Sequence, residues 1–277
     1  MIQKTSWGVW LTVIFMLIIL FGPWIAPMDP NVVDLSKRLQ LPSAEHWLGT
    51  DQLGRDQLSR ILTGGQMTVG ISLMALGLSI MVGVPIGLFA GYLGGRVDWA
   101  LMRLVDAFMA FPEYIVAIVI SGLLGAGFFN LMFAILIVKW VGYARLVRSV
   151  VLQEKSKDYL LVAKISGAGS YTTLRRHLIP HVIGPVLALA TLDIGKVILL
   201  VASLSYIGLG VQPPHPEWGS MLNEGRAYFT QASYLMIVPG MAIFLVVFVM
   251  NLLGNRLVEK IGSDRQEEGR DGITECS

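Results

Sequence analysis

DYLLVAKISGAGSYTTLRRHLIP, residues 158–180, is a polar and basic stretch that separates two long apolar runs of a chain of 277 residues. The stretch has a helical pattern, which Gly167 and Gly169 interrupt. Glycine has no side chain, so another surface can approach the backbone closely at these positions. A solvated loop on the positively charged side of a membrane is the alternative, but such a loop gains nothing from small residues within a helical run. We therefore expect a short docking helix that lies along the membrane.

The composition indicates an all-α, polytopic membrane protein. Hydrophobic residues make up 54% of the chain and charged residues only 14%, whereas a soluble domain carries about 25% charge. The net charge of +2 gives no reason to expect a nucleic-acid partner, because the basic residues cluster beside apolar segments. The only cysteine, Cys276, lies in the polar tail, which excludes a disulfide framework and a cysteine metal cluster.

Runs of about 20 apolar residues, the length needed to cross the hydrocarbon core, recur along the chain. A cleaved signal peptide is the alternative for the first run, but that run is long and no small-x-small cleavage site follows it. In the second run, Gly83, Gly87 and Gly91 form a stripe of small residues that predicts close packing against a partner subunit or the fifth run. The six expected membrane helices cover approximately residues 7–25, 68–93, 101–123, 131–147, 182–209 and 234–253.

Lysine and arginine set the expected orientation of these helices. With the N-terminus in the cytoplasm, most basic residues fall on the inner side, so both termini are expected in the cytoplasm. We divide the chain into an N-terminal helix with an extracytoplasmic segment (1–66), a core transmembrane domain (67–262) and a disordered cytoplasmic tail (263–277). A second outer segment, 210–233, is rich in proline.

Charged side chains within the expected helices are candidates for the lining of a translocation pathway. Each costs about 2.5–3.5 kcal/mol at a helix centre, so each needs a partner or a wet cavity. The structural alternative for Asp106 is an ion pair with Arg103, one turn away. Asp193 and Lys196 could neutralise each other on one helical face, and Lys139 could extend to the membrane surface. The candidate pathway residues are Asp106, Glu113, Asp193 and Lys196.

The two outer segments predict a surface for a docking protein. Tryptophan rings and prolines give a rigid, partly apolar surface, and neighbouring acidic and basic side chains offer charge pairs. A cluster of structural turns, with Arg55 paired internally to Asp51 or Asp56, is the alternative. The candidate docking residues are Trp47, Asp51, Arg55, Asp56 and Trp218.

Metal ligands are not predicted in this chain. His177 and His181 have the four-residue spacing that can bind metal on a helix, but they adjoin the stretch 158–180, so we assign no metal site to them. The 13 methionines pack well in apolar helices, which makes them fillers rather than a thioether path.

The stretch 158–180 resembles a known signature. Val162-Ala163-x-x-x-Gly167, followed after nine residues by His177-Leu178-Ile179-Pro180, is similar to the cytoplasmic signature of binding-protein-dependent ABC importer permeases. That signature begins with a glutamate, a position that Leu161 occupies here, and we assign no role to Leu161. His177 stands where the signature has isoleucine.

Two further stretches are similar to the dipeptide, oligopeptide and nickel subfamily of these importers. One is HWLGTDQLGRD at 46–56, and the other is SYIGLG at 205–210 with the prolines 213–214 and PEWG at 216–219. The resemblance extends from about residue 7 to residue 260, and its three motifs occur in the right order. The chain thus resembles the second, C-type permease subunit of such an importer.

This resemblance implies the type I ABC importer permease fold, with the stretch 158–180 as its cytoplasmic coupling helix. It implies four kinds of partner: the membrane, a second homologous permease, two ATP-binding cassette subunits that bind ATP and magnesium, and an extracytoplasmic substrate-binding protein. The chain itself has no Gly-x-x-x-x-Gly-Lys-Ser/Thr loop, so we expect no cofactor and no enzymatic activity of its own. The residues expected to couple to the ATPase subunits are Asp158, Ala163, Lys164, Gly167, Ala168, Gly169, Arg175, Arg176 and Pro180.

The expected function is to form half of the pathway of a bacterial inner-membrane importer for nickel or a metal chelate (metallophore). Thr191-Leu192-Asp193-Ile194-Gly195 resembles nickel-type members more than peptide-type members. Import of dipeptides or oligopeptides is the alternative, since the binding protein selects the substrate in this family. An ATP-independent secondary transporter would not need the long docking stretch, and a membrane-embedded enzyme would need convergent catalytic groups that the sequence does not show.

Overall fold

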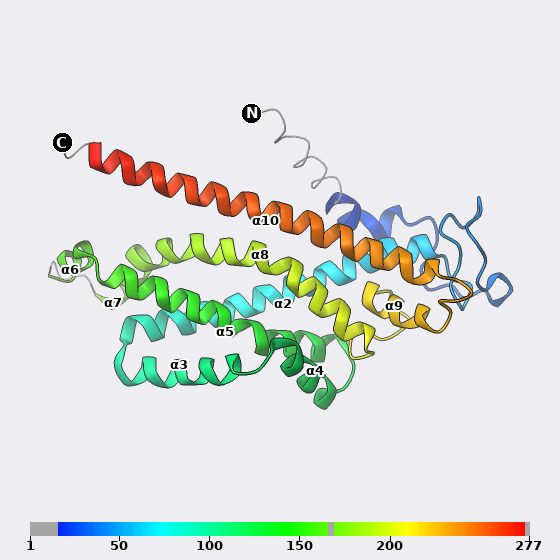
Figure 1. Ribbon diagram of the computed structural model, residues 1–277, viewed down its shortest axis with the longest axis horizontal. Coiled ribbons are helices and arrows are strands. Elements are labelled where there is room, and N and C mark those ends of the chain that lie inside the picture. Colours follow the sequence, from blue (N-terminus) through cyan, green and yellow to red (C-terminus); the bar gives the residue numbers. More distant parts are fainter. Residues whose placement is uncertain (1–15, 166–168, 275–277) are drawn as a thin grey trace. The chain divides into compact units, whose positions relative to one another are not determined.

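The computed structural model describes residues 16–165 and 169–274, and helices make up most of this part of the chain (Figure 1). These residues contain no strand, only an isolated bridge between Thr50 and Asp56. The prediction of an all-α protein is therefore confirmed. The elements are a short apolar helix over Met16–Ile25, the 3-10 helix η1 (Leu35–Lys37), α2 (Gln57–Leu93), α3 (Gly95–Met109), α4 (Glu113–Leu124), α5 (Phe128–Lys155), α6 (Asp158–Ile165), α7 (Ser170–Thr172), the π-helix η2 (Thr173–Leu178), α8 (Ile179–Tyr206), α9 (Trp218–Arg226) and α10 (Tyr234–Thr274).

Three helices in the described part of the chain are long and apolar enough to cross a membrane, or four if the bent pair α3 and α4 forms one span. The prediction of a single continuous helix over 101–123 is wrong, because α3 and α4 are bent by 88° across a break at residues 110–112. Pro112 accounts for the break, since a proline disfavours the helical conformation of the residue before it. The three long helices cover Gln57–Leu93, Ser170–Tyr206 and Tyr234–Arg256.

The chain folds into two compact units, and α2, α5, α8 and α10 each contribute residues to both. Unit 1 contains Met1–Ala75, Tyr114–Ile135 and Ile194–Met250. Unit 2 contains Leu76–Glu113, Leu136–Asp193 and Asn251–Ser277. The two predicted outer segments therefore belong to unit 1, and the stretch 158–180 belongs to unit 2.

Close packing of α2 against α5 forms part of the core of unit 2. A Cβ atom at Gly83 would lie 2.5 Å from the carbonyl oxygen of Trp140. At Gly87 it would lie 2.4 Å from the carbonyl oxygen of Ala144, and Gly91 also faces α5. The stripe is thus a helix–helix face, as predicted. It packs on the predicted fourth helix, however, and not on the fifth or on a partner subunit.

In unit 1, the start of α9 is buried against the N-terminal part of α2. Glu217 caps α9 by accepting hydrogen bonds from two backbone N–H groups of the first turn, at 3.0 and 2.9 Å. The hydroxyl of Thr68 on α2 donates to the same carboxylate at 2.8 Å. The buried indole of Trp218 donates to the carbonyl of Ile61 at 2.9 Å. These contacts fix α9 on α2 within unit 1.

The helix α10 continues to Thr274, and the disorder expected for the tail stays a prediction. Arg265, Gln266 and Glu267 are favourable helix formers. The last apolar helix is therefore extended by polar residues without a break.

Replacement of Gly87 by valine is expected to destabilise the detergent-solubilised chain, because the new side chain meets the backbone of α5. Overpacking of this kind costs about 1–3 kcal/mol, which lowers the melting temperature by several degrees. The control is Gly77→Val, because no atom lies within 4 Å of a Cβ at that position of the same helix. Equal melting temperatures for the two variants would contradict this packing.

Candidate functional site

The described residues of the stretch predicted to couple to ATPase subunits are helical except for Gly169, and the stretch leads directly into α8 (Figure 1). Gly167 and Ala168 lie outside the described residues, and Ala163 and Lys164 belong to α6. Asp158 lies in the first turn of α6, where a negative charge is favourable at the positive end of the helix dipole. The remaining predicted residues are all exposed and open to contact by another protein: Asp158, Gly169, Arg175, Arg176 and Pro180.

The end of this stretch, η2, is a π-helix. The backbone N–H of Ile179 donates to the carbonyl of Leu174, five residues earlier instead of four. Pro180 accounts for the wider turn, because it has no N–H and its ring clashes with the carbonyl four residues before it. Pro180 therefore sets the register in which the stretch joins α8.

Glu154, near the end of α5, is a functional candidate that the sequence analysis does not identify. Its buried carboxylate accepts hydrogen bonds from the Lys157 ammonium at 2.7 Å and from the Tyr159 hydroxyl at 2.8 Å. The three-residue spacing of Glu154 and Lys157 is a signal that the sequence contains. The contact with Tyr159 depends on the turn between α5 and α6, which no pattern in the sequence specifies.

Ion pairs within unit 2 join α3 and the start of α4 to α5. Glu113 and Lys139 lie 3.0 Å apart, and the Lys139 side chain is 5% exposed. Lys139 is therefore a buried partner and does not extend to the membrane surface, which corrects that expectation. Asp106 pairs with Arg145 and not with Arg103, whose guanidinium lies over an aromatic ring of α3. The pairs are Asp98–Arg148, Asp106–Arg145 and Glu113–Lys139.

The four predicted pathway residues differ in their exposure. Asp193 on α8 is buried and accepts a hydrogen bond from the Tyr143 hydroxyl at 3.3 Å. Lys196 is exposed, and the side chains of Asp106 and Glu113 keep exposed fractions of 54% and 42%. Among the described residues, no group of three or more His, Cys, Asp or Glu could hold a metal ion.

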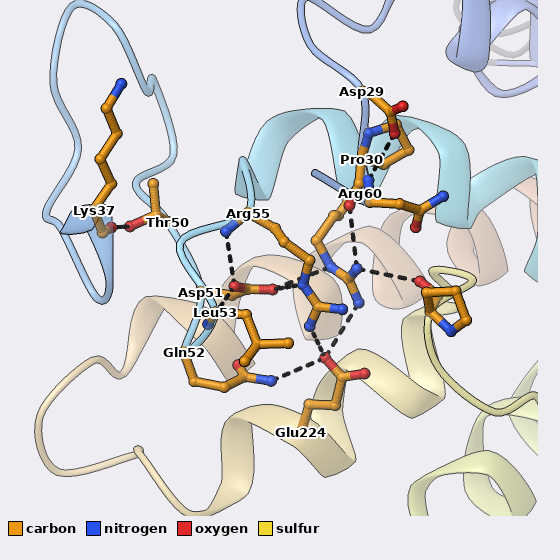
Figure 2. A network of polar contacts seen from close by, with 12 residues as sticks. Asp29, Pro30, Lys37, Thr50, Asp51, Gln52, Leu53, Arg55, Arg60 and Glu224 are labelled. Carbon is orange, nitrogen blue, oxygen red and sulfur yellow. Dashed lines mark hydrogen bonds and ion pairs between the residues drawn. The ribbon is translucent and has the colours of Figure 1, made fainter. Parts of the chain in front are cut away.

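A buried ion network in unit 1 holds the segment before α2 against α9 (Figure 2). The Arg55 guanidinium lies 2.5 Å from Asp51 and 2.6 Å from Glu224. The Arg60 guanidinium lies 3.4 and 3.2 Å from the same two carboxylates. Two positive and two negative charges therefore compensate each other where water is excluded, which is the condition for a stable buried network.

This network bears on the predicted docking residues, whose contact with another protein stays a prediction. For Arg55 and Asp51, the structure shows the alternative of internal pairing. Trp47 keeps the predicted exposure, at 71%. Glu224, which accepts from both arginines, is missing from the predicted residues because nothing near it in the sequence indicates its partners. The predicted docking residues that are buried are Asp51, Arg55, Asp56 and Trp218.

Comparison with known proteins relates this geometry to transport. Residues 83–263 match the family model described as "Binding-protein-dependent transport system inner membrane component". The chain is 43% identical to the nickel transport system permease protein NikC of Escherichia coli K12 over 258 residues, which cover 92% of this chain and 93% of that protein.

Two other similar proteins are named for peptide transport. The probable D,D-dipeptide transport system permease protein DdpC of Escherichia coli K12 is 39% identical, over 88% of this chain and 82% of its own length. The di/tripeptide transport system permease protein DppC of Pseudomonas aeruginosa UCBPP-PA14 is also 39% identical, over 88% and 84%.

The fold is similar to that of solved ABC transporters. An inward-facing structure of the MetNI methionine ABC transporter aligns with a TM-score of 0.57 at 14% identity, over 73% of this chain and 96% of that one. An amino acid ABC transporter solved with histidines aligns with a TM-score of 0.56 at 15% identity, over 73% and 94%. The expected permease fold is therefore confirmed.

Glu224→Ala is expected to loosen the segment before α2, because it leaves the buried guanidinium groups of Arg55 and Arg60 with one carboxylate between them. Breaking a buried pair in this way costs about 3–5 kcal/mol. Hydrogen–deuterium exchange over residues 28–56 measures the effect as faster exchange of the backbone N–H groups. The control is Glu45→Ala, which removes an exposed pair with Lys37. Equal acceleration in the two variants would show that the network does not hold the segment.

Glu113→Ala is expected to destabilise the chain more than Lys139→Met. The first change leaves a buried ammonium without its carboxylate, at a cost of about 3–5 kcal/mol. The second keeps the volume of the buried side chain and leaves a carboxylate that is already 42% exposed. Melting temperatures in detergent give the order of the two variants, and the reverse order would contradict the burial described for this pair.

Proposed function

This chain belongs to the family of binding-protein-dependent transport system inner membrane components. From this membership we propose that it forms half of the translocation pathway of an ATP-driven importer for nickel or a nickel chelate. The observation that supports nickel is the higher identity to the nickel permease, 43%, than to the two dipeptide permeases, 39% each. The family and the apolar helices make the chain a multi-pass protein of the inner membrane.

The proposed complex contains a second homologous permease, two ATP-binding cassette subunits and an extracytoplasmic substrate-binding protein. The cassette subunits bind ATP and magnesium and hydrolyse the nucleotide, and this chain binds no cofactor. The distribution of lysine and arginine supports a cytoplasmic position for both termini and for the stretch 158–180. The exposed Trp47 supports contact of the segment before α2 with the binding protein.

In this proposal, the cassette subunits act on the exposed side of the stretch 158–180, where Arg175 and Arg176 supply positive charge. Closure of the cassette pair on ATP displaces the stretch. Because η2 continues into α8 without a break, the displacement passes to a membrane helix. Rigid-body tilting of such helices opens the pathway alternately to each side of the membrane.

We assign Asp106, Glu113 and Lys196 to the surroundings of the pathway, because their side chains are exposed. We assign Asp193 a structural role, because its carboxylate is buried and accepts a hydrogen bond from the Tyr143 hydroxyl. Asp106 and Glu113 are each paired with a basic side chain, so they add little net charge to the pathway.

Peptide import is the second candidate function, and the two dipeptide permeases that are 39% identical support it. Neither candidate requires this chain to supply ligands for the substrate, because the binding protein makes the selection. The two candidates therefore differ in the transported substrate and share the coupling mechanism.

Uptake of radioactive nickel by cells that lack this chain tests the proposal. We expect nickel accumulation to be lost, to be restored by a plasmid copy of the chain, and to be unaffected by an excess of trialanine. The control is uptake of another divalent cation, magnesium, which should not change. Unchanged nickel uptake together with lost growth on peptides would contradict nickel import and support the second candidate.

A further inference from the structure

Glu154 is the point in unit 2 where α5, α6 and α8 meet through polar contacts. It lies one residue before the end of α5, and it is 7% exposed. Lys157 contacts it from the turn between α5 and α6, and Tyr159 contacts it from the first turn of α6. His181 of α8 lies 3.9 Å from the same carboxylate. One buried acid thus has partners on both sides of the stretch 158–180.

The Tyr159 ring extends this contact to the far end of the stretch. Its centroid lies 6.0 Å from the ring of His177 and 6.2 Å from the ring of His181. The next residue, Leu160, is buried as well. The first turn of α6 is therefore held from one side by α5 and from the other by η2 and α8.

The hydrogen bond from the Tyr159 hydroxyl to the Glu154 carboxylate does not depend on pH in the physiological range. Burial raises the pKa of Tyr159 to about 12, and the hydrogen bond to the Glu154 carboxylate adds to the rise. The hydroxyl therefore remains a donor throughout the physiological pH range. Hydrogen bonds to a charged group are about twice as strong as those between neutral groups, and a buried carboxylate left without donors would be costly.

We propose that Glu154 and Tyr159 are positioning residues that fasten the start of the coupling stretch to α5 and α8, so that a displacement of α6 moves both helices. The inference rests on the proposed function, since it requires cassette subunits that act on α6. Only a two-residue turn, Ser156-Lys157, joins α5 to α6 in the chain. Without the fastening, α6 would rotate about this turn and the displacement would be absorbed there.

The test uses the whole complex, with its second permease, cassette subunits and binding protein, in proteoliposomes. The variants are Glu154→Gln, which removes the charge and keeps the shape, and Tyr159→Phe, which removes only the hydroxyl. We measure ATP hydrolysis together with uptake of two probes, radioactive nickel and trialanine. For the probe that the wild type transports, we expect the amount carried per ATP to fall about tenfold, the size of one charge-assisted hydrogen bond. Basal hydrolysis should stay at the wild-type level.

A double variant separates this role from a general loss of stability. Because the two residues share one hydrogen bond, Glu154→Gln combined with Tyr159→Phe should reduce transport per ATP by less than the product of the two single reductions. The matched controls are Glu45→Gln, an exposed paired acid of unit 1, and Tyr228→Phe, which keeps the ring under Arg38. Both controls should keep the wild-type ratio of transport to hydrolysis.

The outcomes distinguish this inference from the proposed function. A wild-type ratio in both variants, with or without a lower melting temperature, would overturn the positioning role and leave the proposed function intact. If Glu154→Gln fails to retain cassette subunits, the milder Tyr159→Phe decides in the same assay. A wild-type chain that retains no cassette subunits would overturn the proposed function itself, and the inference with it.

Discussion

A charge within an apolar helix needs a polar partner or water, and ion pairs between helices meet this constraint in unit 2. An ion at the centre of a membrane helix is costly, so it is stable only with a partner or with water. Glu113 and Lys139 meet this condition across α4 and α5, and Asp106 and Arg145 meet it across α3 and α5. The pairs therefore attach α3 and α4 to α5 on both sides of their 88° bend. The bend is tolerated because the ends that it creates are held.

Two irregularities of the described backbone, the break at residues 110–112 and the π-helix η2, each lie at or just before a proline and place a functional candidate. The break before Pro112 makes Glu113 the first residue of α4, which brings its carboxylate to Lys139. The π-helix before Pro180 sets the rotation with which the stretch 158–180 enters α8. The same chemistry, a missing N–H and a steric conflict with the preceding turn, thus serves both the charged pair and the coupling stretch.

Local patterns predicted the apolar helices and the glycine stripe, because each depends on residues within a few turns of one another. The family signature around Gly167 predicted the permease fold in the same way. Partners across helices were not predictable: Glu113 and Lys139 are 26 residues apart, and Arg55 and Glu224 are 169 residues apart. For this reason the sequence offered Asp106 only its neighbour Arg103 as a partner, and it left Arg55 open between a docking surface and a local ion pair.

The burial of charged residues at the outer segment has a physical cause that also applies to the proposed pathway. A polar composition indicates solvent exposure only when the charges are unpaired, and Arg55 and Arg60 are neutralised by Asp51 and Glu224. The same compensation operates at two residues of the proposed pathway, Asp106 and Glu113, each of which has a basic partner on α5. At these two positions the chain presents ion pairs rather than isolated carboxylates. Paired charges of this kind are compatible with either proposed substrate, a nickel chelate or a dipeptide.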